Sequence, residues 1–148
     1  MAAPIYFDHA ATTPLTDAAA AAWSRHARTV GNPSSAHGAG RAARRALEEA
    51  REQVAALLGA EPLEVVFTSG GTEADNLAIR GIAQAQRAAD PARRRVLVSA
   101  VEHPAALRAA QRLAHEGFAV DWLPVHPDGR VDAERAEAVI AADPAAVA

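Results

Sequence analysis

The run Ser69–Thr72 carries residue types that could bind a phosphate group. Val65–Phe67, just before it, is apolar and predicts a buried strand, while a helical pattern begins at Glu73. Glycine lets the backbone approach a ligand closely, and the free N–H groups at the start of a helix favour an anion. A strand, a glycine turn and a helix therefore predict an anion site in the turn Gly70–Thr72, with backbone N–H groups and the Thr72 hydroxyl as donors.

The same junction also has a purely structural interpretation. A strand–Gly–Gly–Thr–helix connection is equally typical of a plain tight turn, and Glu73 and Asp75 add negative charge close by. Thr72 and Asp75 have capping-box spacing, which predicts that Thr72 caps the helix. The turn is neither a P-loop, because the Gly-Lys-Ser/Thr ending is missing, nor a dinucleotide fingerprint. The residues alone leave both interpretations open.

A second candidate is His103, which follows the predicted strand Val96–Val98 and precedes Pro104. An imidazole at a strand end could stack on a planar ring and carry protons near neutral pH. The alternative is a surface histidine held extended by the following proline. Four further histidines do not have the spacing of metal ligands; they are His9, His37, His115 and His126.

Short apolar strands alternate with amphipathic helices, which predicts an α/β fold: a three-layer α/β/α arrangement around a mostly parallel sheet. We expect one domain over residues 1–148. Parallel strands place their carboxyl ends along one edge of the sheet, so the glycine turn and the His103 loop should face one crevice. The expected helices cover 17–27, 39–58, 73–88, 105–115 and 133–142, the last with Asp132 as its cap. The expected strands cover 5–7 (or an extended arm), 65–67, 96–98 and 118–123, with a fourth core strand opening at 145–148.

Composition narrows the possible functions. The net charge of -3 argues against a nucleic-acid partner, and no apolar run approaches the length of a membrane span. The N-terminus lacks the features of a signal peptide, so we expect a cytoplasmic protein. The 148 residues contain neither Cys nor Lys, which excludes disulfides, thiolate metal sites and a Cys nucleophile within them.

Four segments in this order resemble the cysteine desulfurases, which form a group in the class V branch of the aminotransferase-like enzymes that use pyridoxal 5′-phosphate. The segments are YFDHAATTPL at 6–15, GNPSSAHGAGRAAR at 31–44, VVFTSGGTEADNLAIRG at 65–81 and SAVEHPA at 99–105. The Gly-Asn-Pro-Ser-Ser form is more similar to the housekeeping and nitrogen-fixation type than to the selenocysteine lyase group. Taken without the resemblance, Asn32 and its neighbours would be only a solvated turn.

The resemblance implies an enzyme that converts L-cysteine to L-alanine and leaves a persulfide on the enzyme, which supplies sulfur for iron–sulfur clusters and tRNA thiolation. It implies a homodimer that works with an iron–sulfur scaffold or another sulfur-acceptor protein. It also assigns roles to residues of this chain. Gly71 and Thr72 would bind the cofactor phosphate, and His103 would stack on the cofactor ring and carry a proton. Asn32 would lie near the substrate carboxylate, and Ala11 and Thr12 would line the same pocket.

The resemblance covers roughly the N-terminal two-fifths of such an enzyme. The family's cofactor-binding Lys, its acceptor Cys and its small C-terminal domain have no counterpart in these 148 residues, so we expect the chain to be inactive alone. Three explanations stay open: a truncated product or record, one half of a split enzyme, or a non-catalytic remnant with a binding role. Another class V enzyme, such as a selenocysteine lyase or an aminotransferase, is the alternative activity.

Overall fold

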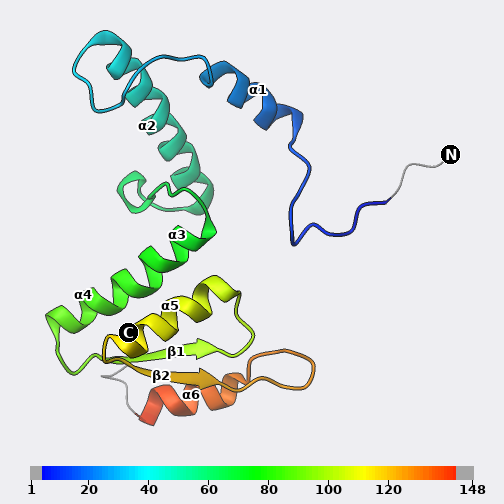
Figure 1. The fold of residues 1–148 in the computed structure, drawn as a ribbon, viewed down its shortest axis with the longest axis vertical. Helices are drawn as coiled ribbons and strands as arrows, with labels where there is room; N and C mark the ends of the chain where they lie inside the picture. The colour runs from blue at the N-terminus through cyan, green and yellow to red at the C-terminus, as the bar shows by residue number, and fades with distance from the viewer. Residues whose placement is uncertain (1–4, 143–148) are drawn as a thin grey trace. The chain divides into compact units, whose positions relative to one another are not determined.

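The computed structural model describes residues 5–142, and its contacts divide the chain into two compact units, Met1–Val66 and Phe67–Ala148. Figure 1 shows the helices of the first unit in blue to cyan-green and the second unit from green to red.

The first unit is helical, and its two α-helices begin and end within one residue of the predicted bounds. Helix α1 (Asp17–His26) starts at Thr16, whose hydroxyl accepts a hydrogen bond from the Ala19 amide at 3.3 Å. Helix α2 (Gly38–Leu58) ends at Gly59, which adopts φ 67°, a left-handed conformation that glycine reaches without a steric penalty. A single 3-10 turn, η1 (Pro62–Glu64), follows. Residues 5–7 form the extended arm that was one of the two expectations for them.

The strand predicted at Val65–Phe67 is wrong. Residues 65–68 are irregular, and the side chains of Val66 and Phe67 are 63% and 45% exposed. An extended segment becomes a strand only by hydrogen bonding to a neighbouring strand. Within residues 5–142 no strand pairs with this segment, so its apolar pattern is present without the sheet that would bury it.

The second unit opens with one long helical segment made of three parts: α3 (Gly71–Asp75), the π-helical turn η2 (Asn76–Arg80) and α4 (Gly81–Ala89). The backbone stays helical through both junctions, with φ/ψ of −65°/−42° at Asn76 and −61°/−48° at Gly81. The helix is thus continuous but carries a wide turn in its middle. Such insertions occur often near functional sites.

A parallel pair of strands follows, β1 (Arg95–Ser99) and β2 (Ala119–Leu123), with Val96 opposite Val120 and Val98 opposite Trp122. Helix α5 (Pro104–His115) connects them, and α6 (Ala133–Ala142) follows β2. In Figure 1, α5 and α6 lie on opposite sides of the two strands, which confirms the predicted α/β class. The strand predicted at 145–148 lies outside the described residues. The buried core of the unit consists of Ala83, Val96, Val98, Ala110, Leu113 and Phe118.

Candidate functional site

The glycine turn is organised by Glu73 rather than by the threonine cap that the sequence predicts. The helix begins at Gly71 with Gly70 in the capping position, so Thr72 lies inside the first turn and does not cap it. The carboxylate of Glu73 instead accepts hydrogen bonds from both the backbone amide and the hydroxyl of Ser69. These bonds, the hydroxyl first, lower the pKa of Glu73 below its ordinary value. The turn is therefore closed by a carboxylate that stays charged.

Two features leave room for an anion at Gly71 and Thr72. The first N–H groups of a helix have no acceptor inside the helix, and Glu73 takes the amide of Ser69 instead of theirs. Space is open around the glycines, because a side chain built at Gly70 or Gly71 would meet no atom within 4 Å. The turn can thus donate backbone hydrogen bonds to a phosphate, although the charge of Glu73 partly opposes the helix end.

His103 occupies the capping position of α5, a role that the sequence reasoning missed. Its Nδ1 accepts a hydrogen bond from the Ala105 amide at 3.2 Å, and Pro104 fills the first helical position as predicted. A histidine followed by Pro at a helix start is a signal that could have found this cap. Because Nδ1 acts as an acceptor, the proton of the neutral imidazole lies on Nε2. The exposed ring therefore presents Nε2 to any ligand.

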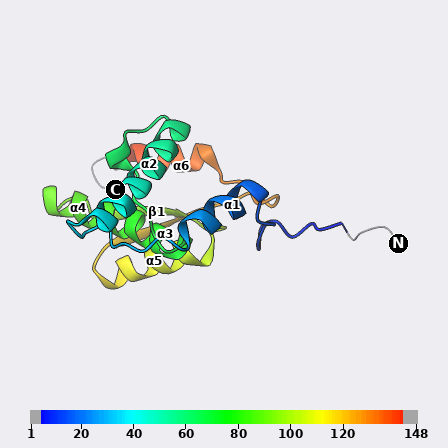
Figure 2. The ribbon, with the colours of Figure 1, turned by 90° about the horizontal axis from the view of Figure 1, so that it is seen from above.

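The two turns belong to neighbouring helices. Helix α3 packs against α5, and both Figures 1 and 2 show them side by side. Both helices run in the same direction in Figure 1, so Gly71–Thr72 and His103 lie at corresponding ends. The arrangement puts backbone N–H donors and an imidazole at the same end of one packed helix pair.

A cavity of about 410 Å³ lies between the long helical segment and β1, and it is not lined by Gly71, Thr72 or His103. Its walls are mainly apolar, and it is lined on its polar side by Asp75, Ser99 and Glu102. Asp75 lines it from the helix, where the sequence predicted only a capping partner. Two of the residues that line the cavity are close in the chain to the two turns: Asp75 follows Thr72 by three residues, and Glu102 directly precedes His103.

In the first unit, Asn32 shapes its own loop. Its Oδ1 accepts the Ser34 amide at 2.9 Å, and its carbonyl accepts the Ser35 amide at 2.9 Å. The loop is pressed onto the start of α2: a Cβ at Gly40 would lie 2.3 Å from the Ser35 carbonyl oxygen and 2.8 Å from that of Asn32. The Asn32 amide nitrogen is the group left to contact a ligand.

Ala11 and Thr12 lie in a tight turn of the arm. Both amides donate to the carbonyl of Asp8, at 3.2 and 3.3 Å. The Tyr6 hydroxyl lies within hydrogen-bond distance of two carbonyl oxygens of the turn, those of Asp8 at 2.8 Å and Thr12 at 3.1 Å, which share its single proton. The turn is thus held by its own residues and stays exposed, which leaves the Thr12 hydroxyl available to a ligand.

Metal-ligating side chains do not gather within residues 5–142. In this part of the chain no three His, Cys, Asp or Glu side chains are grouped to hold a metal ion. No helix there is long and apolar enough to cross a bilayer.

The parallel α/β fold of this chain is that of a known family of proteins. Residues 5–148 match the family described as Aminotransferase class-V, and the chain belongs to that family. Within it, curated relatives of this chain include cysteine desulfurases, which confirms the resemblance seen in the four segments.

An IscS-like cysteine desulfurase of Mycobacterium tuberculosis is 55% identical over 129 residues, covering 86% of this chain and 33% of that protein. A putative cysteine desulfurase of Bacillus subtilis, named IscS 1, is 41% identical over 94% of this chain and 36% of its own length. This chain therefore spans about a third of the curated relatives it matches.

Solved structures agree with this assignment. A NifS-like protein superposes with a TM-score of 0.82 and 36% identity over 91% of this chain and 36% of that chain. A second structure, SspA in complex with cysteine, has a TM-score of 0.80 and 34% identity over 91% of this chain and 38% of its own. Both confirm the fold class.

Proposed function

We propose that this chain works in a cysteine desulfurase that uses pyridoxal 5′-phosphate. The observation that carries the proposal is the packed pair α3 and α5, which begins at Gly71–Thr72 and at His103. The desulfurase relatives named above support L-cysteine as the substrate, as does the complex of SspA with cysteine. The product is L-alanine, and the sulfur passes to an enzyme thiol as a persulfide.

The residues of this chain fit the phosphate end of the cofactor. The amides of Gly71 and Thr72 and the Thr72 hydroxyl bind its phosphate, and Glu73 keeps the turn closed through Ser69. When bound, the cofactor supplies an electron-withdrawing ring, and the protein supplies orientation and proton transfer. His103 stacks on that ring and moves a proton at Nε2, since Nδ1 holds the helix cap.

The remaining groups have separate roles. Asn32 binds the substrate carboxylate through its amide nitrogen, while Ala11 and Thr12 line the pocket. The covalent link to the cofactor and the sulfur-accepting thiol come from outside these 148 residues, which contain no Lys and no Cys. The complete protein is a cytoplasmic homodimer that passes sulfur to an iron–sulfur scaffold or another acceptor protein.

The test is a substrate comparison on the complete protein that carries this chain. It is loaded with pyridoxal 5′-phosphate and given L-cysteine, L-selenocysteine or an amino-acid and keto-acid pair. We expect equal amounts of alanine and reducible sulfur from cysteine, with a persulfide detected by mass spectrometry. Amino transfer to the keto acid would assign an aminotransferase instead, turnover confined to selenocysteine would assign a lyase, and no turnover at all would leave a binding role.

A further inference from the structure

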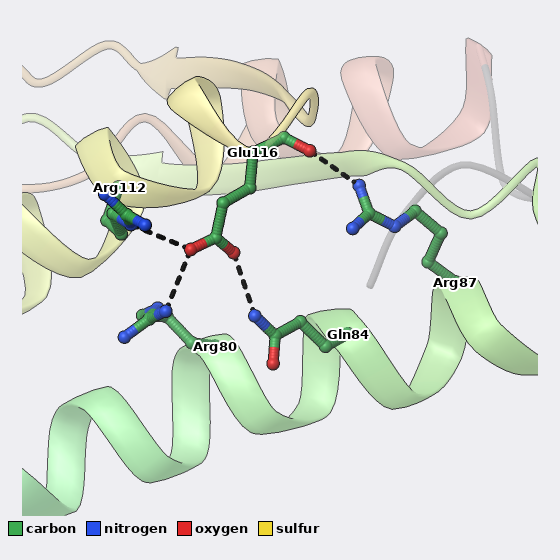
Figure 3. A network of polar contacts seen from close by, with 5 residues as sticks. All are labelled: Arg80, Gln84, Arg87, Arg112 and Glu116. Atoms are coloured by element: carbon green, nitrogen blue, oxygen red, sulfur yellow. Dashed lines mark hydrogen bonds and ion pairs between the residues drawn. The ribbon is translucent and has the colours of Figure 1, made fainter.

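Glu116 joins the two helices of the candidate site at a point away from their starts (Figure 3). Its Oε1 accepts hydrogen bonds from Arg80 and Arg112, each at 2.8 Å, and its Oε2 accepts one from Gln84 at 2.8 Å. Its backbone carbonyl accepts a fourth from Arg87 at 2.9 Å. We call these five residues the Glu116 clamp.

Most hydrogen bonds of the Glu116 clamp join two helices and do not lie within one helix. Glu116 ends α5, whereas Arg80, Gln84 and Arg87 follow one another on one face of the η2–α4 helix. Arg112 is the exception, because it lies one turn before Glu116 on the same helix. The bonds from Gln84, then Arg112 and Arg80, lower the pKa of Glu116 to about 2, so its charge persists at neutral pH.

The clamp is also anchored to the core. The guanidinium carbon of Arg87 lies 3.9 Å from the centroid of the Phe118 ring, and Phe118 is only 4% exposed. The Nε of Arg80 is buried without a hydrogen-bond partner, so this nitrogen loses its hydration in the arrangement that brings the guanidinium group to Glu116. A sliding motion of one helix along the other would break several of these contacts together.

From this geometry we propose that Glu116 is a positioning residue, which fixes the separation between the Gly71–Thr72 turn and His103 through the helices that begin there. At 1.5 Å per residue, Gly71 is ~14 Å from Arg80 and Pro104 is ~18 Å from Glu116. A tilt of about 10° at the clamp moves helix ends at these distances by ~2–3 Å. Errors of that size are enough to spoil a catalytic arrangement.

The proposal rests on the proposed function only in taking the Gly71–Thr72 turn and His103 as parts of one cofactor site. Its test needs no cofactor. The chain has no native Cys, so Thr72→Cys and Glu102→Cys accept spin labels at these two positions alone. Pulsed electron resonance on the 148-residue chain then measures the distance between the labels and the width of its distribution. Circular dichroism reports folding in parallel.

Two variants break the link between the helices, and two controls leave it in place. Glu116→Ala removes the acceptor, and Arg80→Gln removes one donor across the helix pair. Arg112→Gln removes a donor from the same helix as Glu116, and Asp128→Asn removes an exposed ion pair with Arg130 elsewhere in the unit. We expect the first pair to shift the distance between the labels, or to broaden its distribution, by ~2–3 Å, which is the displacement of the helix ends for a tilt of about 10°. We expect both controls to leave the distance unchanged.

If the distance between the labels is unchanged in a folded Glu116→Ala or Arg80→Gln chain, the proposal is overturned. This holds even if the melting temperature of the variant falls, because loss of a contact that only stabilises the fold would lower the melting temperature without changing the distance. If Glu116→Ala does not fold, Arg80→Gln decides by the same criterion. An equal shift in either control, Arg112→Gln or Asp128→Asn, also overturns it. A failure of the proposed function shows separately, as absent turnover in the complete protein.

Discussion

Glu73 accepts a hydrogen bond from the backbone amide of Ser69, with 2.7 Å between the nitrogen and Oε2. This bond joins the last residue before the glycines to the third residue of the helix, so it closes the turn on itself. It uses an amide that could otherwise bind an anion and leaves those of Gly71 and Thr72. The phosphate proposal therefore concerns the helix start and not the whole turn.

Thr72→Ala should weaken retention of pyridoxal 5′-phosphate by the complete protein. Loss of a hydrogen bond to a charged group costs about 1.5–3 kcal/mol, which corresponds to a fall in affinity on the order of tenfold to a hundredfold. Thr72→Ser keeps the hydroxyl and is the matched control. Equilibrium dialysis measures the affinity. Equal affinity in the wild-type and Ala proteins would remove Thr72 from the site.

His103→Asn should separate the two roles of this residue. Asn is a good N-cap and can accept the Ala105 amide in place of Nδ1, so thermal unfolding should stay near that of wild type. Proton transfer is lost, and kcat should fall by ~10²–10⁴. His103→Ala should lose both, with about 1 kcal/mol of stability. A His103→Asn enzyme with wild-type kcat would refute the catalytic role.

Acid should weaken the Glu116 clamp over a defined pH range. The pKa of Glu116 is lowered from 4.5 to about 2, so the folded state holds the proton less tightly than the unfolded state. The stabilisation is complete above the unfolded value and is lost as pH falls from 4.5 through about 2. We expect the melting temperature of wild type to exceed that of Glu116→Gln near pH 6, and the gap to close by about pH 2. A gap that widens on acidification would contradict this.

Two glycines of α2 provide a matched pair of substitution sites that test how closely the Asn32 loop packs on this helix. At Gly40 a Cβ would meet the Ser35 carbonyl oxygen at 2.3 Å, whereas at Gly38 the nearest atom would be 4.0 Å away. Gly40→Ala should therefore cost about 1–3 kcal/mol and displace the loop. Gly38→Ala should be neutral or stabilising by up to about 1 kcal/mol. Denaturant unfolding measures both, and equal effects would show that the loop does not need this close approach.

The isolated 148-residue chain should not hold the cofactor covalently. It has no lysine amine, so borohydride reduction in the presence of pyridoxal 5′-phosphate should add a pyridoxyl group at the α-amino terminus alone. It should also release no sulfide from cysteine. Intact-mass and peptide-mass spectrometry check the first expectation. A modified internal residue would contradict the reasoning.

Local signals predicted most of the helices. Thr16 caps α1, Gly59 ends α2 and Pro104 opens α5, and each acts within a few residues of its own position. Such contacts are encoded by neighbours in sequence, so they could be found without a structure. The strand at 65–67 failed for the opposite reason: pairing is supplied by a distant segment.

By itself, the sequence determined the α/β class, the family resemblance and the residue types at the two turns. Only the tertiary structure decided that α3 and α5 pack together and that Glu116 links them, because Arg80 and Glu116 are 36 residues apart in the chain. It also decided that Glu73 rather than Thr72 closes the glycine turn. Hydrogen bonds between helices depend on where each helix lies, and helical periodicity does not specify that placement.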